Sequence, residues 1–156
     1  MLLAESLYDW LMFLHIVAAM VWLGGLVTLT VLVTLALRGG RPAAVAAFVG
    51  NLRVIGPLLF APAMAVVLGL GIWMVADSDA WALGQLWVRL ALALFAAAFF
   101  IGAEFQSRSA ILAQRAVGAG DDAEAARQLR RWSWGMRLIL FLLLVVTWDM
   151  VFKPGI

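Results

Sequence analysis

Length, composition and charge exclude an ordinary soluble domain. Hydrophobic residues make up 66% of the 156 residues and charged residues 13%, whereas soluble domains average about 45–50% apolar and about 25% charged residues. The chain contains no cysteine, which excludes disulfides and thiolate metal sites. The net charge is only +2, so the placement of the charges along the chain is more informative than their sum.

The chain contains four apolar runs, each of which extends to the roughly 20 residues that cross a bilayer core. We expect membrane-spanning helices at about 8–37, 55–76, 84–106 and 132–152. These spans predict an all-α fold, a four-transmembrane-helix bundle that forms a single domain over residues 1–156. The first run is longer than a signal-peptide core and follows Glu5 and Asp9, so we expect it to remain in the mature protein.

Glycine and proline residues mark the expected ends of the first two helices. Gly39 and Pro42 predict where the first helix stops. Gly56 and Pro57 predict the start of the second helix, because proline is tolerated in a first turn, where its missing N–H would be unpaired anyway. Pro62 lies deeper in the second span and predicts a bend there.

Spans three and four are expected to continue as helices beyond the membrane. Glu104 and Arg108 are spaced to pair on one helical face. After a break at Gly120, Asp121 and Glu124 resemble a capping box, which predicts a helix that starts there and runs into span four.

The arginines indicate the orientation of the chain. They gather in the connection between spans one and two (Arg38, Arg41, Arg53) and around the connection between spans three and four (Arg108, Arg115, Arg127, Arg130, Arg131, Arg137). The positive-inside rule places both connections in the cytoplasm and both termini outside. We expect this arginine-rich inner surface to meet anionic lipid headgroups and not nucleic acid.

His15, the only histidine, lies inside the first span and is the most informative single residue. At helical spacing it shares a face with small residues such as Ala18 and Gly25, which allow helices to approach closely, so we expect it to point into the bundle. An ionisable group in a span costs roughly 2–3 kcal/mol or more unless it has a partner or a task. His15 is therefore the leading candidate for a functional residue.

A similar pattern occurs in the second span. Ala61, Ala65 and Gly69 place a small residue at every fourth position. This stripe predicts a second face that packs at close range.

Two more charged residues lie near the expected outer ends of their spans. Arg89 comes about one turn into span three and Asp149 about one turn from the end of span four, while His15 lies about 10 Å inward of Tyr8. All three side chains can meet in the outer half of the bundle. One interpretation is an Arg89–Asp149 pair beside a hydrogen-bonded histidine, and the other is a ligand site that all three residues form.

The ligand chemistry that best matches a single buried imidazole is axial coordination of haem b. A haem with two histidine ligands is excluded within one chain by the count of one. Four methionines on candidate helices offer a possible second ligand, although their spacing favours none of them: Met12, Met64, Met74 and Met150. The inventory of ligands does not support a histidine-rich copper or zinc site, so no metal-ion site is predicted.

Three segments resemble known families. YDWLMFLHIVAAMVWLGGL, VIGPLLFAPAMAVVLGLGIWMV and VFKPG resemble a bacterial family of predicted four-helix integral membrane proteins of unknown function (the domain of unknown function 2269 type). LHIVAAMVWLGGL is also similar to the first helix of copper-resistance D domains and of haem-containing protoporphyrinogen oxidases, which implies a functional role for His15. In LWVRL, Arg89 corresponds to a lysine of the oxidases, whereas their proline–arginine motif after the first helix is absent.

These resemblances imply a multi-pass protein of the bacterial cytoplasmic membrane. Three functions remain open from the sequence. The leading one is binding of haem b or another small ligand by His15, Arg89 and Asp149. The second is a structural or accessory subunit that packs against a membrane-protein partner or a second copy of itself, and the third is a transporter or proton relay that uses the titration of His15 near neutral pH.

Overall fold

A computed structural model describes the backbone of residues 2–155 and the side chains of residues 7–52, 54–56 and 58–155. The side chains of Glu5, Arg53 and Pro57, used in the expectations above, lie outside the described residues. Every regular element of the described backbone is a helix, and four helical stretches are long and apolar enough to cross a membrane. The prediction of an all-α protein with four membrane-spanning helices is confirmed.

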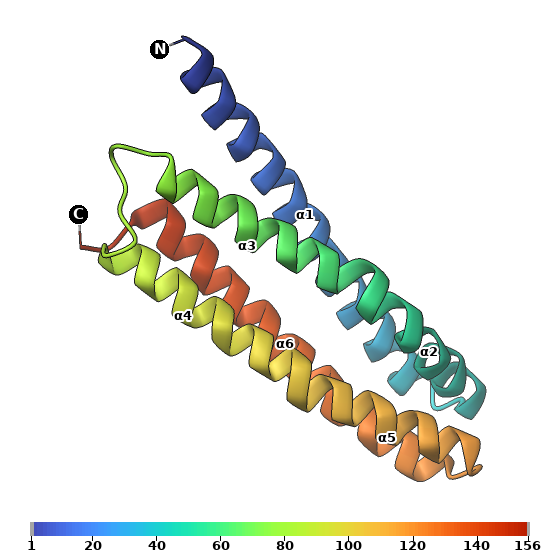
Figure 1. Cartoon of the computed structure of the whole chain (residues 1–156). Coiled ribbons are helices and arrows are strands. Elements are labelled where there is room, and N and C mark those ends of the chain that lie inside the picture. The colour runs from blue at the N-terminus through green and yellow to red at the C-terminus, as the bar shows by residue number, and fades with distance from the viewer. Residues whose placement is uncertain (1, 156) are drawn as a thin grey trace.

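The chain runs through four continuous helical stretches joined by short connections (Figure 1). In chain order these are α1 (Leu2–Arg38); α2 (Pro42–Ile55), η1 (Gly56–Phe60) and α3 (Ala61–Ala76); α4 (Leu86–Phe100), η2 (Ile101–Gln106) and α5 (Ser107–Gly118); and α6 (Asp122–Phe152). The start of α1, the end of α6 and the loop 77–85 lie at one end of the molecule, which we call the terminal end. The turns 39–41 and 119–121 lie at the opposite end, which we call the turn end.

The second helical stretch corrects one boundary prediction. It begins at Pro42 with α2 and continues through Gly56 and Pro57, which therefore do not start the helix. Proline fits the first turn of α2 as well as it would fit the expected start. Further along, a proline inside a helix lacks an N–H and crowds the carbonyl four residues earlier. The π turn of η1 is wider than an α-helical turn. It contains Pro57 and ends shortly before Pro62.

The helical extensions of spans three and four are confirmed. The Asp121 carboxylate accepts a hydrogen bond from the Glu124 backbone N–H at 2.9 Å and so caps the start of α6. Glu104 and Arg108 form the expected ion pair, with 2.9 Å between nitrogen and oxygen. Helix α2 adds an extension that the sequence analysis missed, and its buried residues Val45 and Val49 join the hydrophobic core.

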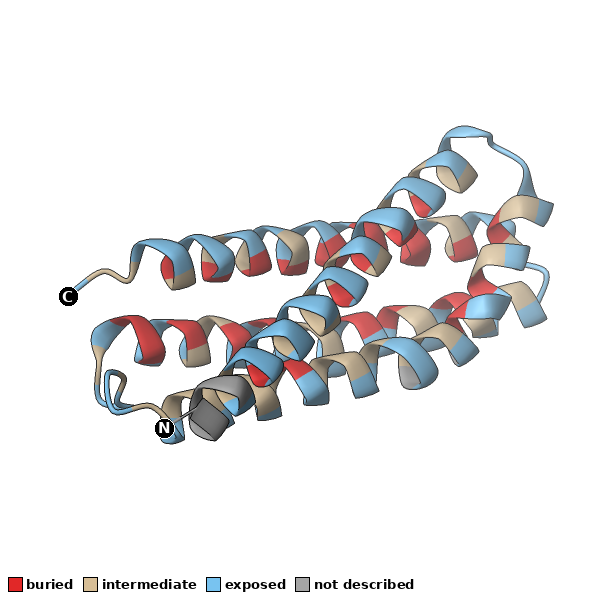
Figure 2. Cartoon of the chain, turned by 90° about the horizontal axis from the view of Figure 1, so that it is seen from above, coloured by how far each residue is buried: buried red, intermediate tan, exposed pale blue. Residues whose placement is uncertain are grey.

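The helices pack in the order α3, α1, α6, α4. Helix α3 rests chiefly on α1, which also contacts α6, and α6 pairs with α4 and α5. Only 6% of the apolar window of α3 is buried, compared with 33% for α6. In Figure 2 the buried residues lie on the helix faces that turn toward one another, and the outer faces are exposed. The molecule is thus an open bundle in which α3 is the peripheral helix.

The small-residue stripe on α3 does not pack within the chain. Ala61, Ala65 and Gly69 are exposed, and a Cβ added to Gly69 would meet no atom within 4 Å. The prediction of close packing at this stripe is therefore wrong within one chain. The reason is that this helical stretch meets α1 through a different face, which carries Phe60 of η1 and Gly71 of α3.

Candidate functional site

His15 lies between α1 and α3, on the face that the sequence predicted to point inward. Its neighbours on that face, Leu11 and Trp22, are buried, whereas Met12 is exposed. A Cβ added to Gly71 of α3 would lie 3.1 Å from the Cε1 atom of His15. The imidazole therefore occupies the space that a side chain at Gly71 would fill.

One nitrogen of this imidazole has no partner. The Nδ1 atom of His15 is buried and makes no hydrogen bond with any described residue. The ring also lies beside the backbone of Val67, one turn before Gly71 on α3. Burial of a polar atom without a hydrogen bond costs free energy, and native structures keep few such atoms. This nitrogen is therefore the atom of His15 on which a ligand hypothesis can be based.

Asp149 is a second buried polar group without a partner. It lies on α6, four residues from the start of the connection after the helix, and only 2% of its surface is exposed. Neither carboxylate oxygen accepts a hydrogen bond from a described residue. A charged carboxylate without a partner is costly to bury, so Asp149 also favours a ligand or a proton.

Arg89 does not pair with Asp149. Its side chain is exposed, because α4 turns Val88 and Ala91 toward the core and Arg89 lies between them on the outer side. Among the described residues the ion pairs join Glu104 to Arg108 and Glu124 to Arg127, and neither involves Arg89. The three predicted site residues thus lie in the half of the bundle near the terminal end, but the Arg89–Asp149 ion pair is not formed.

The terminal end carries a cluster that the sequence analysis did not predict. Lys153 adopts a left-handed conformation directly after α6, and its Nζ atom lies 4.5 Å from the centre of the Trp81 ring and 5.8 Å from that of Trp87. Trp87 donates its indole N–H to Gln85 at 3.0 Å. Cation–π contacts of this kind attach the end of α6 to the loop 77–85 and to the start of α4. The signal in the sequence was the lysine that precedes Pro154 and Gly155.

A polar contact between η2 and α6 was also missed. Gln106 is buried and, with its amide nitrogen toward the Trp132 carbonyl, donates to that oxygen at 2.8 Å and accepts from the Met136 N–H at 3.1 Å. The side chain reaches the α6 backbone because Gly135 has no Cβ there. The available signal was a glutamine at the end of the third span, but the sequence does not reveal which glycine faces it.

Comparison with known proteins identifies one family. A family model described as predicted integral membrane protein (DUF2269) matches residues 9–154. No curated protein and no solved structure matches the chain. The matched region includes His15, Arg89 and Asp149 and nearly all of the helical stretches described above.

Proposed function

The chain belongs to a family of predicted integral membrane proteins of unknown function (DUF2269), and we propose that it binds a small ligand at His15, with haem b as the expected ligand. The observation that carries the proposal is the buried Nδ1 atom of His15, which has no hydrogen-bond partner among the described residues. A ligand that occupies this nitrogen would remove the cost of its burial.

Asp149 supports the same location. Its unpaired carboxyl group lies on α6, which packs against the helix that carries His15, and both groups belong to the half of the bundle near the terminal end. With only 13% of its residues charged, the chain places few ionisable groups inside its spans. Intramembrane groups of this kind mark ligand or proton sites more often than random positions do.

His15 is the residue that would hold a haem in this chain. An imidazole ring inside a helical bundle is a common haem ligand, and His15 has a ring nitrogen that no described residue occupies. When bound, haem would supply redox or gas-binding chemistry. Arg89 is exposed on the outer side of α4, which packs chiefly on α6, so Arg89 is not expected to contact a ligand between α1 and α3. Asp149 would then hold a proton or a second polar group of the ligand.

An absorption spectrum tests the haem assignment. Protein purified gently from cells that make haem is expected to show a Soret band, and His15→Ala is expected to lose it. Ile16→Ala, which changes the exposed neighbour of His15 on α1, is the matched control and should keep the band. Absence of a Soret band from the wild-type protein, or an unchanged band in His15→Ala, would exclude haem coordination by this residue.

We also propose that the protein resides in the bacterial cytoplasmic membrane with its turn end in the cytoplasm. The arginines of the turns and extensions support this orientation through the positive-inside rule. Alkaline phosphatase fused after Ile156 is expected to be active, because the enzyme folds only outside the cytoplasm. The same reporter inserted at Ala119 should be inactive, and the reverse pattern would refute the orientation.

A second function is favoured by one specific observation. The stripe of Ala61, Ala65 and Gly69 faces outward from the peripheral helix α3 with nothing packed against Gly69. Small residues of this kind mediate close helix contacts in membranes. An accessory subunit that packs through α3 against a partner would use this face, and it would tolerate substitution of His15.

A further inference from the structure

A cluster of arginines surrounds a hollow between α1 and α6 in the half of the molecule near the turn end. The hollow has a volume of about 250 Å³. Its lining consists of Thr34, Leu37, Arg38, Arg130, Ser133, Trp134 and Arg137. The lining of this hollow therefore contains three arginines and no acidic residue.

The three arginines have no acidic partner among the described residues. The ion pairs formed near the turn end use Arg108 and Arg127 instead. Arg137 is nevertheless held in place, because its guanidinium donates to the Thr34 hydroxyl at 3.4 Å and lies 5.3 Å from the centre of the Trp134 ring. Arginines that line one hollow without an acidic partner favour an anion with several acceptor oxygens, and guanidinium groups match the geometry of phosphate.

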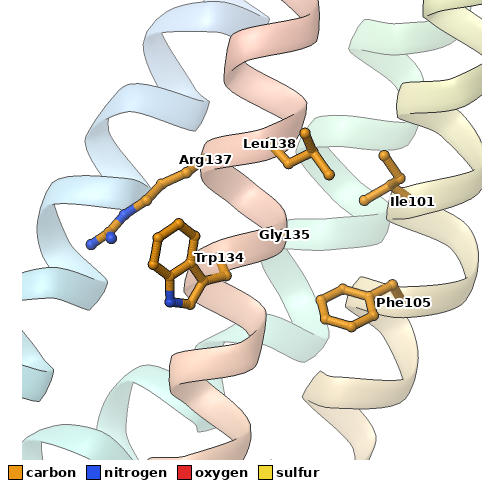
Figure 3. A pocket seen from close by; sticks show the side chains of 6 residues that line it. All are labelled: Ile101, Phe105, Trp134, Gly135, Arg137 and Leu138. Carbon is orange, nitrogen blue, oxygen red and sulfur yellow. The ribbon is translucent and has the colours of Figure 1, made fainter.

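A second hollow adjoins the first on the other side of α6. It has a volume of about 520 Å³ and an almost entirely apolar lining of Ile101, Phe105, Trp134, Gly135, Arg137 and Leu138. Trp134 and Arg137 line both hollows. Figure 3 shows Arg137 extending from α6 toward α1, while Ile101 and Phe105 reach toward α6 from η2 on the opposite side. A polar site and an apolar groove thus meet at two shared residues.

The two hollows are ordered as the parts of an amphiphile would be at a membrane surface. From Arg130 to Leu138 the distance along α6 is about 12 Å, and it leads from the charged extension into the apolar span. A headgroup at the arginines and a hydrocarbon chain along the groove would follow this direction. Basic sites between helices at the membrane surface bind anionic headgroups in this manner.

We propose that this surface is a specific binding site for an anionic phospholipid. Its phosphate would lie among Arg38, Arg130 and Arg137, and one acyl chain would lie in the apolar hollow beside Trp134 and Leu138. Free phosphate offers the same oxygen chemistry, but it would leave the adjoining apolar groove empty. The groove is the reason to assign a lipid. The site lies in the opposite half of the bundle from His15 and does not depend on the ligand proposed there.

Native mass spectrometry of the full chain in a neutral detergent tests the assignment. Phosphatidylglycerol, phosphatidylcholine and inorganic phosphate are titrated separately. The triple variant Arg38→Gln, Arg130→Gln, Arg137→Gln is expected to weaken phosphatidylglycerol binding by about tenfold or more, because it removes charge-assisted hydrogen bonds. The matched control, Arg41→Gln, Arg115→Gln, Arg131→Gln, removes the same charge from exposed arginines that line neither hollow and should stay within about twofold of wild type.

A substitution in the apolar hollow distinguishes a lipid headgroup from free phosphate as the ligand. Leu138→Trp places a larger side chain in the apolar hollow without a change in charge, so it should weaken the binding of phosphatidylglycerol and leave that of inorganic phosphate unaffected. Binding of phosphatidylcholine as tight as that of phosphatidylglycerol, or equal losses in the two triple variants, would overturn the site. Phosphatidylglycerol binding that Leu138→Trp leaves unchanged, or inorganic phosphate binding as tight as that of phosphatidylglycerol, would overturn the lipid assignment. Circular dichroism checks that every variant retains its helices.

Discussion

Gly71→Val is expected to displace the imidazole of His15 and to weaken ligand binding there by about tenfold or more. Even a single added Cβ would lie 3.1 Å from Cε1 and 3.6 Å from Nδ1 of the ring. Valine adds two further methyl groups where the imidazole already packs against the helix. Overpacking of this kind lowers the free energy of unfolding by about 1–3 kcal/mol. A ligand titration, followed by absorption for haem, measures the loss, and the thermal unfolding midpoint should fall with it.

Gly69→Val is the matched control on the same helix. A Cβ at this position meets no atom within 4 Å, so the variant should bind the ligand as the wild type does and change the stability of the single chain by no more than about 0.5 kcal/mol. Equal effects of the two variants would contradict the assignment of the site to the α1–α3 contact. Loss of a copurifying partner or of self-association in Gly69→Val alone would instead support the accessory-subunit function.

Local patterns predicted the helices well because their causes are local. The capping interaction of Asp121 and the pairing of Glu104 with Arg108 depend on spacings within a single helix, and both occur as expected. The inward face of α1 was also predictable, because helical periodicity alone places His15 on the same face as the buried Trp22. These features need no knowledge of the neighbouring helices.

The missed helix α2 shows where a local signal becomes ambiguous. Pro42 and Pro57 both fit the first turn of a helix, and the sequence by itself does not choose between them. Tertiary packing makes the choice, since Val45, Val49 and Leu52 are buried in the core only if the helix already begins at Pro42. The π turn of η1 then carries the chain past the second proline.

The candidate site was harder to predict because it depends on which helices become neighbours. Depth along each span correctly placed His15, Arg89 and Asp149 in the same half, but depth does not determine direction around a helix axis. The burial of Trp87 and Val88 sets the rotation of α4 and turns Arg89 outward. In the same way, the pairing of α3 with α1 through Gly71 leaves the predicted small-residue stripe exposed.

Gly135→Ala is expected to lower the stability of the fold at the contact between η2 and α6. The added Cβ would lie 2.7 Å from the Gln106 carboxamide and 3.0 Å from the Phe105 ring, so both side chains must move. Gln106 would then lose its bonds to the α6 backbone while it remains buried. An unpaired buried amide costs about 1–3 kcal/mol and the crowding a further 1–3 kcal/mol or so. The thermal unfolding midpoint in detergent measures the sum.

Gly102→Ala is the matched control because it adds the same methyl group on the other side of this contact. Its Cβ would lie 3.9 Å from the Ile139 side chain, which is an ordinary van der Waals distance, so the variant should be as stable as the wild type or slightly more stable through helix propensity. Gln106→Ala combined with Gly135→Ala removes one of the two clashing groups. The double variant should therefore lose less stability than the sum of the single variants, as expected for residues in direct contact. Additive losses would show that the Gln106–Gly135 contact does not hold η2 against α6.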